Sequence, residues 1–518
     1  MDRRTFLMHA GRAGGFLVLG GAALAACSDD ESDPGSSSGS SGTSGSGSGS
    51  GSGSSTTAAP STTNADGVPA GSILDGTAAD SGIDHVVVVM MENRSFDHWL
   101  GWLGGDEAWL EQGRSRYGGD FGVTANLEQS FTDPAGQEVA TQHLLELLSG
   151  GNPWRGCGHP DPGHGWDHGR VQRDQGFLAD GSRNDPFALG YYLGDDLPFS
   201  SLLARRFTVC DHSFASVLGP TYPNREYLHS GQSGGEKTNY LPLEDGGFTW
   251  ETIWDRLEAA GVEHGYYYTD LPTTLLWGTR MTPWASEVDQ YFQRCEDGTL
   301  PAVSFVDPGF LGGSRTDNHP HGDVRAGERF VRDAFAAFAR SPHWERGLFV
   351  LTYDEWGGFF DHVAPPTFPD DRTSTDDAEN FGQAGFRVPT VLASPFARPG
   401  SVDSRVYDHT SVLRFLEWRF LGAPPEGTGG DGWWLTTRDR NALNLGASLV
   451  TEATPDLDLD LDVDIAPESP ACAEDAEAEG LSVDIGDPHA FELALDQGYF
   501  ERVGFTPKPT LMARDWVV

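Results

Sequence analysis

The sequence has almost no lysine: only Lys237 and Lys508 occur among its 518 residues. Asp and Glu number 77 against 34 Lys and Arg, and the net charge is −43. A polyanion of this kind is repelled by the phosphates of nucleic acid and by anionic membrane surfaces. The composition therefore argues against nucleic acid as a partner, and nothing in the sequence indicates an obligate protein partner.

The N-terminus lacks an apolar run long enough for a spanning helix. Residues 14–27 are apolar but short and rich in glycine and alanine. Arg3 and Arg4 precede them, and paired arginines before such a segment are typical of a Tat export signal. The end of the segment resembles a lipoprotein cleavage box, in which Cys27 becomes the lipidated first residue. Cleavage as an ordinary signal near the alanines is the alternative.

Serine and glycine dominate residues 35–55, a composition typical of a flexible linker. A tether is useful where one end is held, so it favours a lipid anchor at Cys27. We therefore expect a signal over residues 1–27 and a tether over residues 28–80. The protein would be exported by Tat and anchored to the outer face of the cell membrane or cell envelope.

Cysteine is also scarce, with five in the chain. If Cys27 carries lipid, four remain: Cys157, Cys210, Cys295 and Cys472. Four cysteines allow three pairings, and the sequence does not choose among them. Because an exported protein meets oxidising surroundings, we expect one or two disulfides.

Beyond the tether, apolar runs alternate with helical patterns. Strands are predicted at 85–91, 207–214, 262–268, 302–307, 347–356 and 388–396, and helices at 248–261, 323–341 and 408–422. This alternation predicts an α/β fold, a three-layer α/β/α arrangement with a mostly parallel central sheet. We expect it to occupy residues 81–425.

A smaller, irregular extension, residues 426–518, is expected to pack on this domain. Aspartate alternates with aliphatic residues over 456–465, which suits an edge strand with one wet face. A calcium loop is the alternative, but the segment lacks the spaced glycine and closing glutamate of an EF-hand.

Oxygen-bearing side chains follow two of the predicted strands. Glu92 and Asn93 come after the first, and Asp354 and Glu355 end a much later one. The carboxyl ends of parallel strands form the ligand-binding edge of such a sheet. Carboxylates gathered there suit a divalent cation, because without one they repel each other. The alternative is that each pair only caps the following turn.

A third element is the segment SVLGPTYPNREYLHSG, residues 216–231. Pro223 suits the first turn of a helix, so Thr221 would lie at the helix N-terminus, where an anion is favoured. A hydroxyl at such a place, beside a metal, can lose its proton and attack phosphorus.

Five segments together resemble one family: MMENRSFDHWLG, GPTYPNREYLHSG, DNHPHGDVRAGERFV, YDEWGGFFDHVAPP and YDHTSVLRFLEWRF. The family is the bacterial phosphoesterases, which comprise phospholipases C and a related acid phosphatase within the alkaline-phosphatase-like superfamily. The resemblance covers about residues 83–422. It implies an alkaline-phosphatase-like fold. It also implies one divalent metal ion (Ca, Zn or Mg) bound by Glu92, Asn93, Asp354 and Glu355, with Thr221 as both nucleophile and metal ligand.

The resemblance further implies histidines that contact phosphate or protonate the leaving group, a role that imidazolium donors fill well. His319 is the best match and His164 the next, with His168 and His321 as close rivals. A separate zinc site is the alternative for Cys157, His159, His164 and His168, although their loose spacing disfavours it.

Other polar and aromatic residues have plainer interpretations. Arg94 and Arg225 are expected to fix loops by pairing with carboxylates. Asp408 and His409 are expected to cap the following helix, with a supporting role at the site left open. Tyr266, Tyr267, Tyr268 and Trp277 are expected in the core or at its rim rather than in a choline cage.

The sequence thus predicts a metal-dependent phosphoesterase of phospholipase C type, which cleaves phosphodiesters through a phosphothreonine-type intermediate. Its expected partners are a phospholipid or other phosphoester substrate and the membrane, through lipidated Cys27. An acid phosphatase is the first alternative, because the residues after 425 are too few for the additional C-terminal domains of some family phospholipases C. A non-catalytic surface lipoprotein that kept the fold is the second.

Overall fold

The computed structural model describes residues 71–149, 151–242, 246–310, 315–453 and 461–472. At its centre is an eight-stranded sheet in the order β13-β6-β12-β11-β1-β10-β8-β9. The strands are β1 (His85–Met91), β6 (Thr208–Cys210), β8 (His264–Tyr268), β9 (Ala285–Glu287), β10 (Val303–Asp307), β11 (Gly347–Tyr353), β12 (Val391–Ala393) and β13 (Ser401–Asp403). All neighbours pair in parallel except β12, which is antiparallel to both β11 and β6. The predicted mostly parallel sheet is confirmed.

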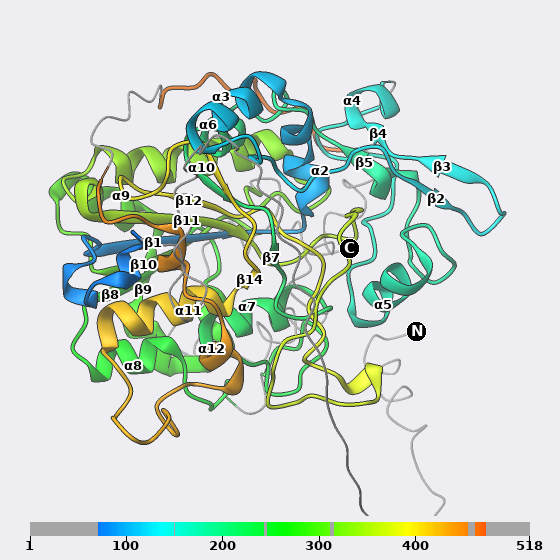
Figure 1. Cartoon of the computed structure of the whole chain (residues 1–518). Coiled ribbons are helices and arrows are strands. Elements are labelled where there is room, and N and C mark those ends of the chain that lie inside the picture. The colour runs from blue at the N-terminus through cyan, green and yellow to red at the C-terminus, as the bar shows by residue number, and fades with distance from the viewer. Residues whose placement is uncertain (1–70, 150, 243–245, 311–314, 454–460, 473–518) are drawn as a thin grey trace, which may run out of the picture. The chain divides into compact units, whose positions relative to one another are not determined.

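Helices cover both faces of this sheet (Figure 1). One layer holds α6 (Pro198–Arg206), α9 (Val288–Asp297) and α10 (Val324–Arg340). The other holds α7 (Thr221–Ser230), α8 (Ile253–Ala259), α11 (Thr410–Leu416) and α12 (Thr437–Asn441), and a π-helical turn, Glu417–Leu421, follows α11. With both faces covered, residues 86–91 of β1 are all buried, which explains their unbroken apolar run.

The pattern of α10 shows why it is a helix. Asp323 caps its N-terminus by accepting the backbone N–H of Arg325. Val331, Phe335 and Phe338 recur at helical spacing and are buried against the sheet layer.

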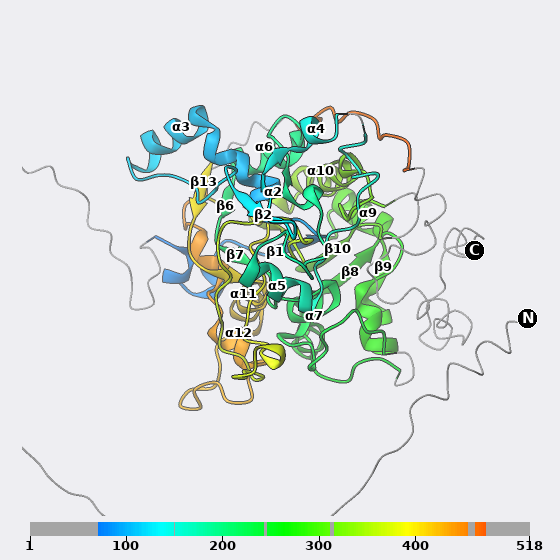
Figure 2. The same ribbon diagram turned by 90° about the vertical axis from the view of Figure 1, so that its right-hand side faces the viewer.

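Smaller elements surround the edge where β1 and β11 end. They are α2 (Phe96–Leu100), α3 (Glu107–Tyr117), α4 (Leu144–Leu147), α5 (Trp166–Gln175), the hairpin of β2 (Ser130–Thr132) and β3 (Glu138–Ala140), and the pairs β4 (Gln142–His143) with β5 (Gly190–Tyr191) and β7 (Ser213–Phe214) with β14 (Tyr407–Asp408). Short 3-10 segments lie at Ile73–Asp75, Ala78–Asp80, Gly101–Gly105, Pro186–Leu189, Thr273–Trp284, Trp344–Arg346, Asp377–Glu379 and Leu445–Ser448. Figure 2 looks onto this side of the molecule.

Three predicted elements differ from the structure. The expected strand 207–214 is two strands, because the chain turns after Cys210 and β7 pairs with β14 outside the main sheet. The helix predicted from residue 248 begins only at Ile253, where Thr252 and Asp255 form a capping box. The strand predicted over 388–396 is only three residues long, since β12 pairs with its neighbours only there.

The predicted tether does not extend to residue 80. Ile73 is 1% exposed, and its backbone N–H donates to the Leu449 carbonyl at 3.1 Å. The Ser72 hydroxyl donates to the Gly446 carbonyl at 2.7 Å. Burial of an apolar side chain thus fixes this stretch to the domain. The predicted signal, Cys27 and the tether up to residue 70 lie outside the described residues. Among the residues that are described, no helix combines the length and apolarity needed to cross a membrane.

Residues 461–472, here called the C-terminal strap, run along α10. Arg332 donates to the Val463 carbonyl at 3.1 Å, and Arg329 donates to the Ala466 carbonyl at 2.9 Å. The two carbonyls accept hydrogen bonds from these arginine side chains instead of from a neighbouring strand. Residues 461–465 form no strand. The edge-strand prediction is therefore wrong for this part, and residues 456–460 lie outside the described ranges.

One disulfide joins Cys157 to Cys472, while Cys210 and Cys295 are buried free thiols. The bond attaches the end of the C-terminal strap to the loop before α5. Because Cys157 is oxidised, it cannot supply a thiolate to zinc, and the alternative zinc site is wrong.

Cys472→Ser is expected to lower the free energy of unfolding by about 2–5 kcal/mol, because the disulfide closes a loop of 315 residues in the unfolded chain. Urea unfolding with and without dithiothreitol measures this. Reduction should destabilise the wild-type protein by the same amount and leave the variant unchanged. Equal stability of the oxidised and reduced wild-type protein would contradict the expectation.

Candidate active site

The two acidic pairs lie side by side because β1 and β11 are neighbouring parallel strands. Met91 of β1 is in register with Tyr353 of β11, so the residues after each strand leave the sheet together. The Asn93 backbone N–H donates to Asp354 Oδ1 at 3.1 Å. The Arg94 backbone N–H donates to the carbonyl of Glu355, also at 3.1 Å. Residues about 260 positions apart thus form one edge, as the sequence predicted.

A buried arginine on α7 links this edge to the helix that begins with Thr221. Arg225 Nη2 lies 3.1 Å from Glu92 Oε1, and its Nε lies 3.4 Å from Asp354 Oδ2. Its Nη1 is 3.5 Å from Asp307 Oδ1 at the end of β10. Arg225 follows Thr221 by one helical turn, so both residues lie on one face of α7.

Arg225 therefore pairs with carboxylates, as predicted, whereas Arg94 fixes its loop differently. Arg94 Nε donates to the Asn318 carbonyl at 2.9 Å, and its guanidinium lies 4.7 Å from the centre of the Phe359 ring. It thereby holds the segment that contains His319 against the end of β1.

Thr221 is the first residue of α7, which confirms the predicted position at a helix N-terminus. It is also fully buried. Among the described residues, neither Thr221 Oγ1 nor Asn93 Oδ1 has a hydrogen-bond partner. Asn93 also has a positive φ of 59°, and Gly357 packs so closely on it that a Cβ would lie 2.1 Å from the Asn93 carbonyl. Buried oxygens without partners are costly, and they indicate that a bound group completes the site.

The donor set fits a divalent cation. Two or three carboxylates, an amide oxygen and a hydroxyl are hard oxygen ligands of the kind that Ca²⁺ and Mg²⁺ prefer and Zn²⁺ accepts. Burial raises the pKa of Glu92 well above its usual range and that of Asp354 to about 6, while Arg225 opposes both shifts. A cation would lower both pKa values, because it stabilises the ionised carboxylates.

His164 and His319 stand beside Asn93 with one neighbouring carboxylate. His164 Nε2 lies 3.3 Å from Asn93 Nδ2, and His319 Nε2 lies 3.7 Å from Asp161 Oδ2. The two rings meet edge to face with centres 5.9 Å apart. Each ring bonds a backbone carbonyl through Nδ1, that of Pro162 for His164 and that of Pro320 for His319. With Asp161, the two histidines form a group of side chains close enough together to hold a metal ion.

The two rival histidines make other contacts. His321 Nε2 bonds the carbonyl of His159 at 2.9 Å. His168 lies on α5, where its ring packs against the backbone of Gly163 and Gly165. Neither belongs to the group formed by Asp161, His164 and His319, so the structure brings two of the four candidate histidines to the site.

Sequence reasoning missed three acidic residues of this region. Asp161 lies in the histidine-rich segment, Asp307 ends a predicted strand, and the carbonyl of Asp317 accepts the Glu92 N–H at 2.8 Å. The strand-end rule that found Glu92 would also have found Asp307. Asp161 and Asp317 lie in loops, where no periodicity identifies a residue.

A second acidic group, Asp97 with Asp361, is filled by an arginine. Arg387 Nε lies 2.9 Å from Asp361 Oδ1, and its Nη2 lies 3.1 Å from Asp97 Oδ1. All three side chains are fully buried. Arg387 thus joins the loops after β1 and β11 through these carboxylates, and His362, which bonds Asp97, completes a second group of side chains that could hold a metal ion.

Two interpretations of the remaining residues are confirmed. Tyr266, Tyr267 and Trp277 are buried in the core. Asp408 Oδ1 caps α11 by accepting the Thr410 N–H at 3.0 Å. His409 directly precedes α11, but its side chain makes no capping hydrogen bond, so the prediction is wrong for this residue, whose ring contacts are described below.

Comparison with known proteins was made for sequence and for structure. The Phosphoesterase family matches residues 83–421, which include every side chain of the site described above. Non-specific phospholipase C5 of Arabidopsis thaliana is 33% identical over 348 residues, 62% of this chain and 65% of that protein. Phospholipase C B of Mycobacterium tuberculosis is 30% identical over 66% of this chain and 74% of its own. The non-hemolytic phospholipase C of Burkholderia pseudomallei is 29% identical over 67% of this chain and 56% of its own.

Among solved structures, a protein of the alkaline phosphatase superfamily from Vibrio parahaemolyticus aligns with 43% of this chain and 59% of its own, at 12% identity and a TM-score of 0.29. Murine ectonucleotide pyrophosphatase/phosphodiesterase 5 aligns with 53% of this chain and 97% of its own, at 12% identity and a TM-score of 0.28.

Proposed function

The chain belongs to the Phosphoesterase family, a family of hydrolases of phosphoric esters, and from this premise we propose that it is a metal-dependent phosphodiesterase of phospholipase C type. One observation carries the proposal: Arg225, one helical turn after Thr221 on α7, contacts both Glu92 and Asp354, and Asp354 also accepts the Asn93 backbone N–H. The phospholipases C among its relatives support a phosphodiester substrate.

One divalent cation would be held by oxygens from Glu92, Asn93, Thr221, Asp354 and Glu355. When bound, such a cation neutralises charge on phosphoryl oxygens and lowers the pKa of a hydroxyl that it contacts. Arg225 carries one positive charge and contacts three carboxylates, so these carboxylates keep an excess of negative charge that a bound cation would offset.

Thr221 is the proposed nucleophile. Its hydroxyl gives its proton to solvent, and Oγ1 forms a bond to phosphorus while the bond from phosphorus to the lipid alcohol breaks. Backbone N–H groups at the start of α7 stabilise the negative charge on the non-bridging oxygens. His164 binds one of these oxygens through Nε2.

His319 is the proposed general acid. Its Nε2 protonates the departing alkoxide, and Asp161 at 3.7 Å stabilises the imidazolium form. Water then attacks phosphorus and gives one proton to His319, the bond from phosphorus to Thr221 Oγ1 breaks, Oγ1 regains a proton from solvent, and the phosphorylated head group is released. Two displacements give overall retention of configuration at phosphorus.

We also propose that the protein is exported by Tat and held at the outer face of the membrane or envelope by lipid on Cys27. The twin arginines and the cleavage box support this. Such an anchor would keep the site close to a lipid substrate, and a zwitterionic head group would not be repelled by the acidic surface.

The substrate class is tested by comparing p-nitrophenyl phosphorylcholine with p-nitrophenyl phosphate, and by assaying phosphatidylcholine vesicles for phosphocholine release. We expect kcat/KM to be at least about tenfold higher for the diester, because a site shaped for a second ester group loses binding energy with a monoester. Elemental analysis of protein purified without chelator should find one divalent metal per chain. A preference for the monoester would instead assign the protein as an acid phosphatase.

A further inference from the structure

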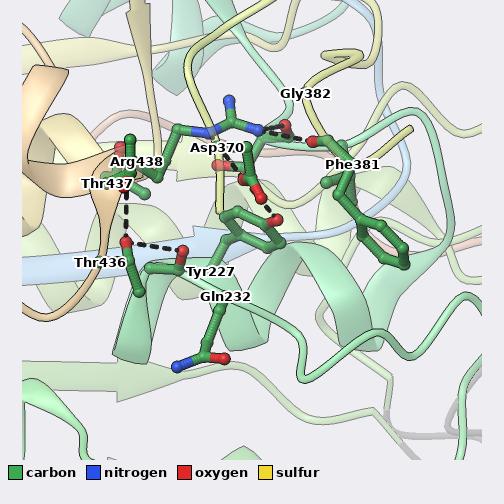
Figure 3. A network of polar contacts seen from close by, with 12 residues as sticks. Tyr227, Gln232, Asp370, Phe381, Gly382, Thr436, Thr437 and Arg438 are labelled. Atoms are coloured by element: carbon green, nitrogen blue, oxygen red, sulfur yellow. Dashed lines mark hydrogen bonds and ion pairs between the residues drawn. The ribbon is translucent and has the colours of Figure 1, made fainter. Parts of the chain in front are cut away.

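A buried arginine outside the residues matched to the family contacts several parts of the site's scaffold. Arg438 lies on α12 (Thr437–Asn441), beyond residue 421, where the family match ends. Its side chain is 2% exposed. Figure 3 shows it beside Asp370, Tyr227 and Phe381, which come from three separate segments. Burying a charged guanidinium costs free energy unless it is fully paired, so the partners of Arg438 hold its side chain in one position.

Two carboxylates and two carbonyls complete its coordination. Arg438 Nε lies 3.3 Å from Asp370 Oδ2, and Nη1 lies 3.3 Å from Asp408 Oδ2. Nη2 donates to the carbonyls of Ser216 and Phe381, both at 2.9 Å. The planar guanidinium, with five donors in fixed directions, satisfies all four at once, which a lysine cannot do.

These partners hold the nucleophile helix at two points. Ser216 lies five residues before Thr221, and its hydroxyl donates to Asp408 Oδ2 at 3.2 Å. Tyr227, in the middle of α7, donates its hydroxyl to Asp370 Oδ2 at 2.7 Å (Figure 3). Arg438 thus joins the segment entering α7 to the helix itself.

The α12 helix is also fixed at the far end of α7. The Thr436 hydroxyl donates to the carbonyl of Gly231, which ends α7 in a left-handed conformation. The Thr437 backbone N–H donates to Asp371 Oδ2 at 3.0 Å. The first contact joins α12 to the end of α7, and the second joins it to the loop that contains Asp370.

The same network reaches the metal-binding edge through His409. His409 Nε2 donates to the Tyr353 carbonyl at 2.9 Å, and its Nδ1 accepts the Ser216 N–H at 3.4 Å. Tyr353 directly precedes Asp354. His409 therefore fixes the distance between the end of β11 and the segment that leads to Thr221.

We propose that Arg438 is a positioning residue for phosphoryl transfer, which fixes Thr221 relative to Asp354 and Glu355 through Asp408, Ser216 and His409. The inference rests on the proposed function and adds that the C-terminal region takes part in it. Arg438 itself contacts no reacting atom. Its effect is on the relative positions of Thr221, Asp354 and Glu355.

Arg438→Gln tests the proposal, with Arg440→Gln as the matched control. Arg440 lies on the same helix, but its side chain is 46% exposed and its partner Asp431 is 82% exposed. We expect Arg438→Gln to lower kcat by about 10–100-fold, because displacements of about 1 Å at a reactive centre have effects of this size. KM should stay within about threefold, since substrate binding groups are retained, and Arg440→Gln should match the wild type. Rates are normalised to the folded fraction obtained from urea unfolding.

Ser216→Ala supplies a milder variant in case Arg438→Gln does not fold. It removes one hydroxyl contact to Asp408 and leaves no charge unpaired, so kcat should fall about 3–10-fold with little change in KM. The proposal is overturned if both variants keep wild-type kcat per folded molecule, or if activity falls only in proportion to the unfolded fraction.

A binding measurement separates this proposal from the proposed function. Calorimetric titration with Mn²⁺ reports the metal site without turnover, and we expect Arg438→Gln to bind Mn²⁺ at least about threefold more weakly, because Asp354 is displaced. If the wild-type protein hydrolyses no phosphoester, the proposed function fails, and the Mn²⁺ titration still decides the role of Arg438. Unchanged Mn²⁺ affinity together with unchanged kcat would remove that role.

Discussion

Thr221→Ala is expected to reduce kcat on a phosphodiester by about 10³-fold or more, the largest effect predicted for this chain, because loss of a nucleophile removes the covalent route entirely. The hydroxyl is buried at the start of α7, and no described side chain replaces it there. Thermal stability should change little, since the hydroxyl makes no hydrogen bond among the described residues that would be lost. Initial rates on p-nitrophenyl phosphorylcholine, with calorimetry of both proteins, measure this.

Thr221→Ser is the control for that experiment. It keeps the hydroxyl and should retain most of the activity. Rapid acid quenching of the wild-type protein during turnover should leave the phosphorylated head group on the peptide that contains Thr221, detectable by mass spectrometry. Full activity of Thr221→Ala would exclude the covalent mechanism, and inactivity of all three proteins would favour the non-catalytic lipoprotein.

Asp354→Asn is expected to weaken binding of a divalent metal by at least about 100-fold, because it would remove an ionised carboxylate from the proposed ligands. The wild-type protein should show a related pH dependence. Burial raises the pKa of Asp354 to about 6, so protons compete with the metal below that pH. Metal affinity should therefore fall as pH decreases through 6. Calorimetric titration with Mn²⁺ between pH 5 and pH 8 measures both effects.

In the metal-free protein, the free energy of unfolding should depend on pH in the opposite direction to the metal affinity. A carboxyl whose pKa rises on folding favours the folded state when it is protonated, so its contribution to the free energy of unfolding falls as pH rises from about 4 through 6. Chelation should therefore lower the melting temperature more at pH 8 than at pH 5. Asp431→Asn, at an exposed aspartate, is the control and should change neither quantity. Metal affinity that does not vary with pH would show that Asp354 is not a ligand.

Long, fully buried elements were predictable from the sequence alone. The strands β1, β10 and β11 and the helix α10 lie within a few residues of their expected positions. Their signal is physical: a strand covered on both faces must be apolar throughout, and a helix on the sheet must repeat its apolar residues at helical spacing. The shorter strands β6, β7 and β12 were misjudged, because their lengths depend on where a partner strand begins and ends.

The site residues also divide into those that could be located from the sequence and those that could not. Glu92, Asn93 and Asp354 could be placed because they follow long strands that end at one edge of the sheet. The family resemblance ranked His164 above His321, but periodicity could not separate them, since both stand in irregular loops whose path depends on contacts with distant segments. Asp161 and Arg438 were not identified at all, and each is brought to its partners by chain folding alone.

By itself, the sequence determined the layered α/β architecture, the edge at which acidic residues gather and the helix that begins with Thr221. These follow from local rules, namely strand and helix periodicity and the direction of parallel strands. Tertiary structure decided that His164 contacts Asn93, that Cys157 bonds Cys472, and that Arg438 joins α12 to the segment before α7. Such contacts join segments hundreds of residues apart, and their geometry is fixed only when burial and charge pairing are satisfied together throughout the fold.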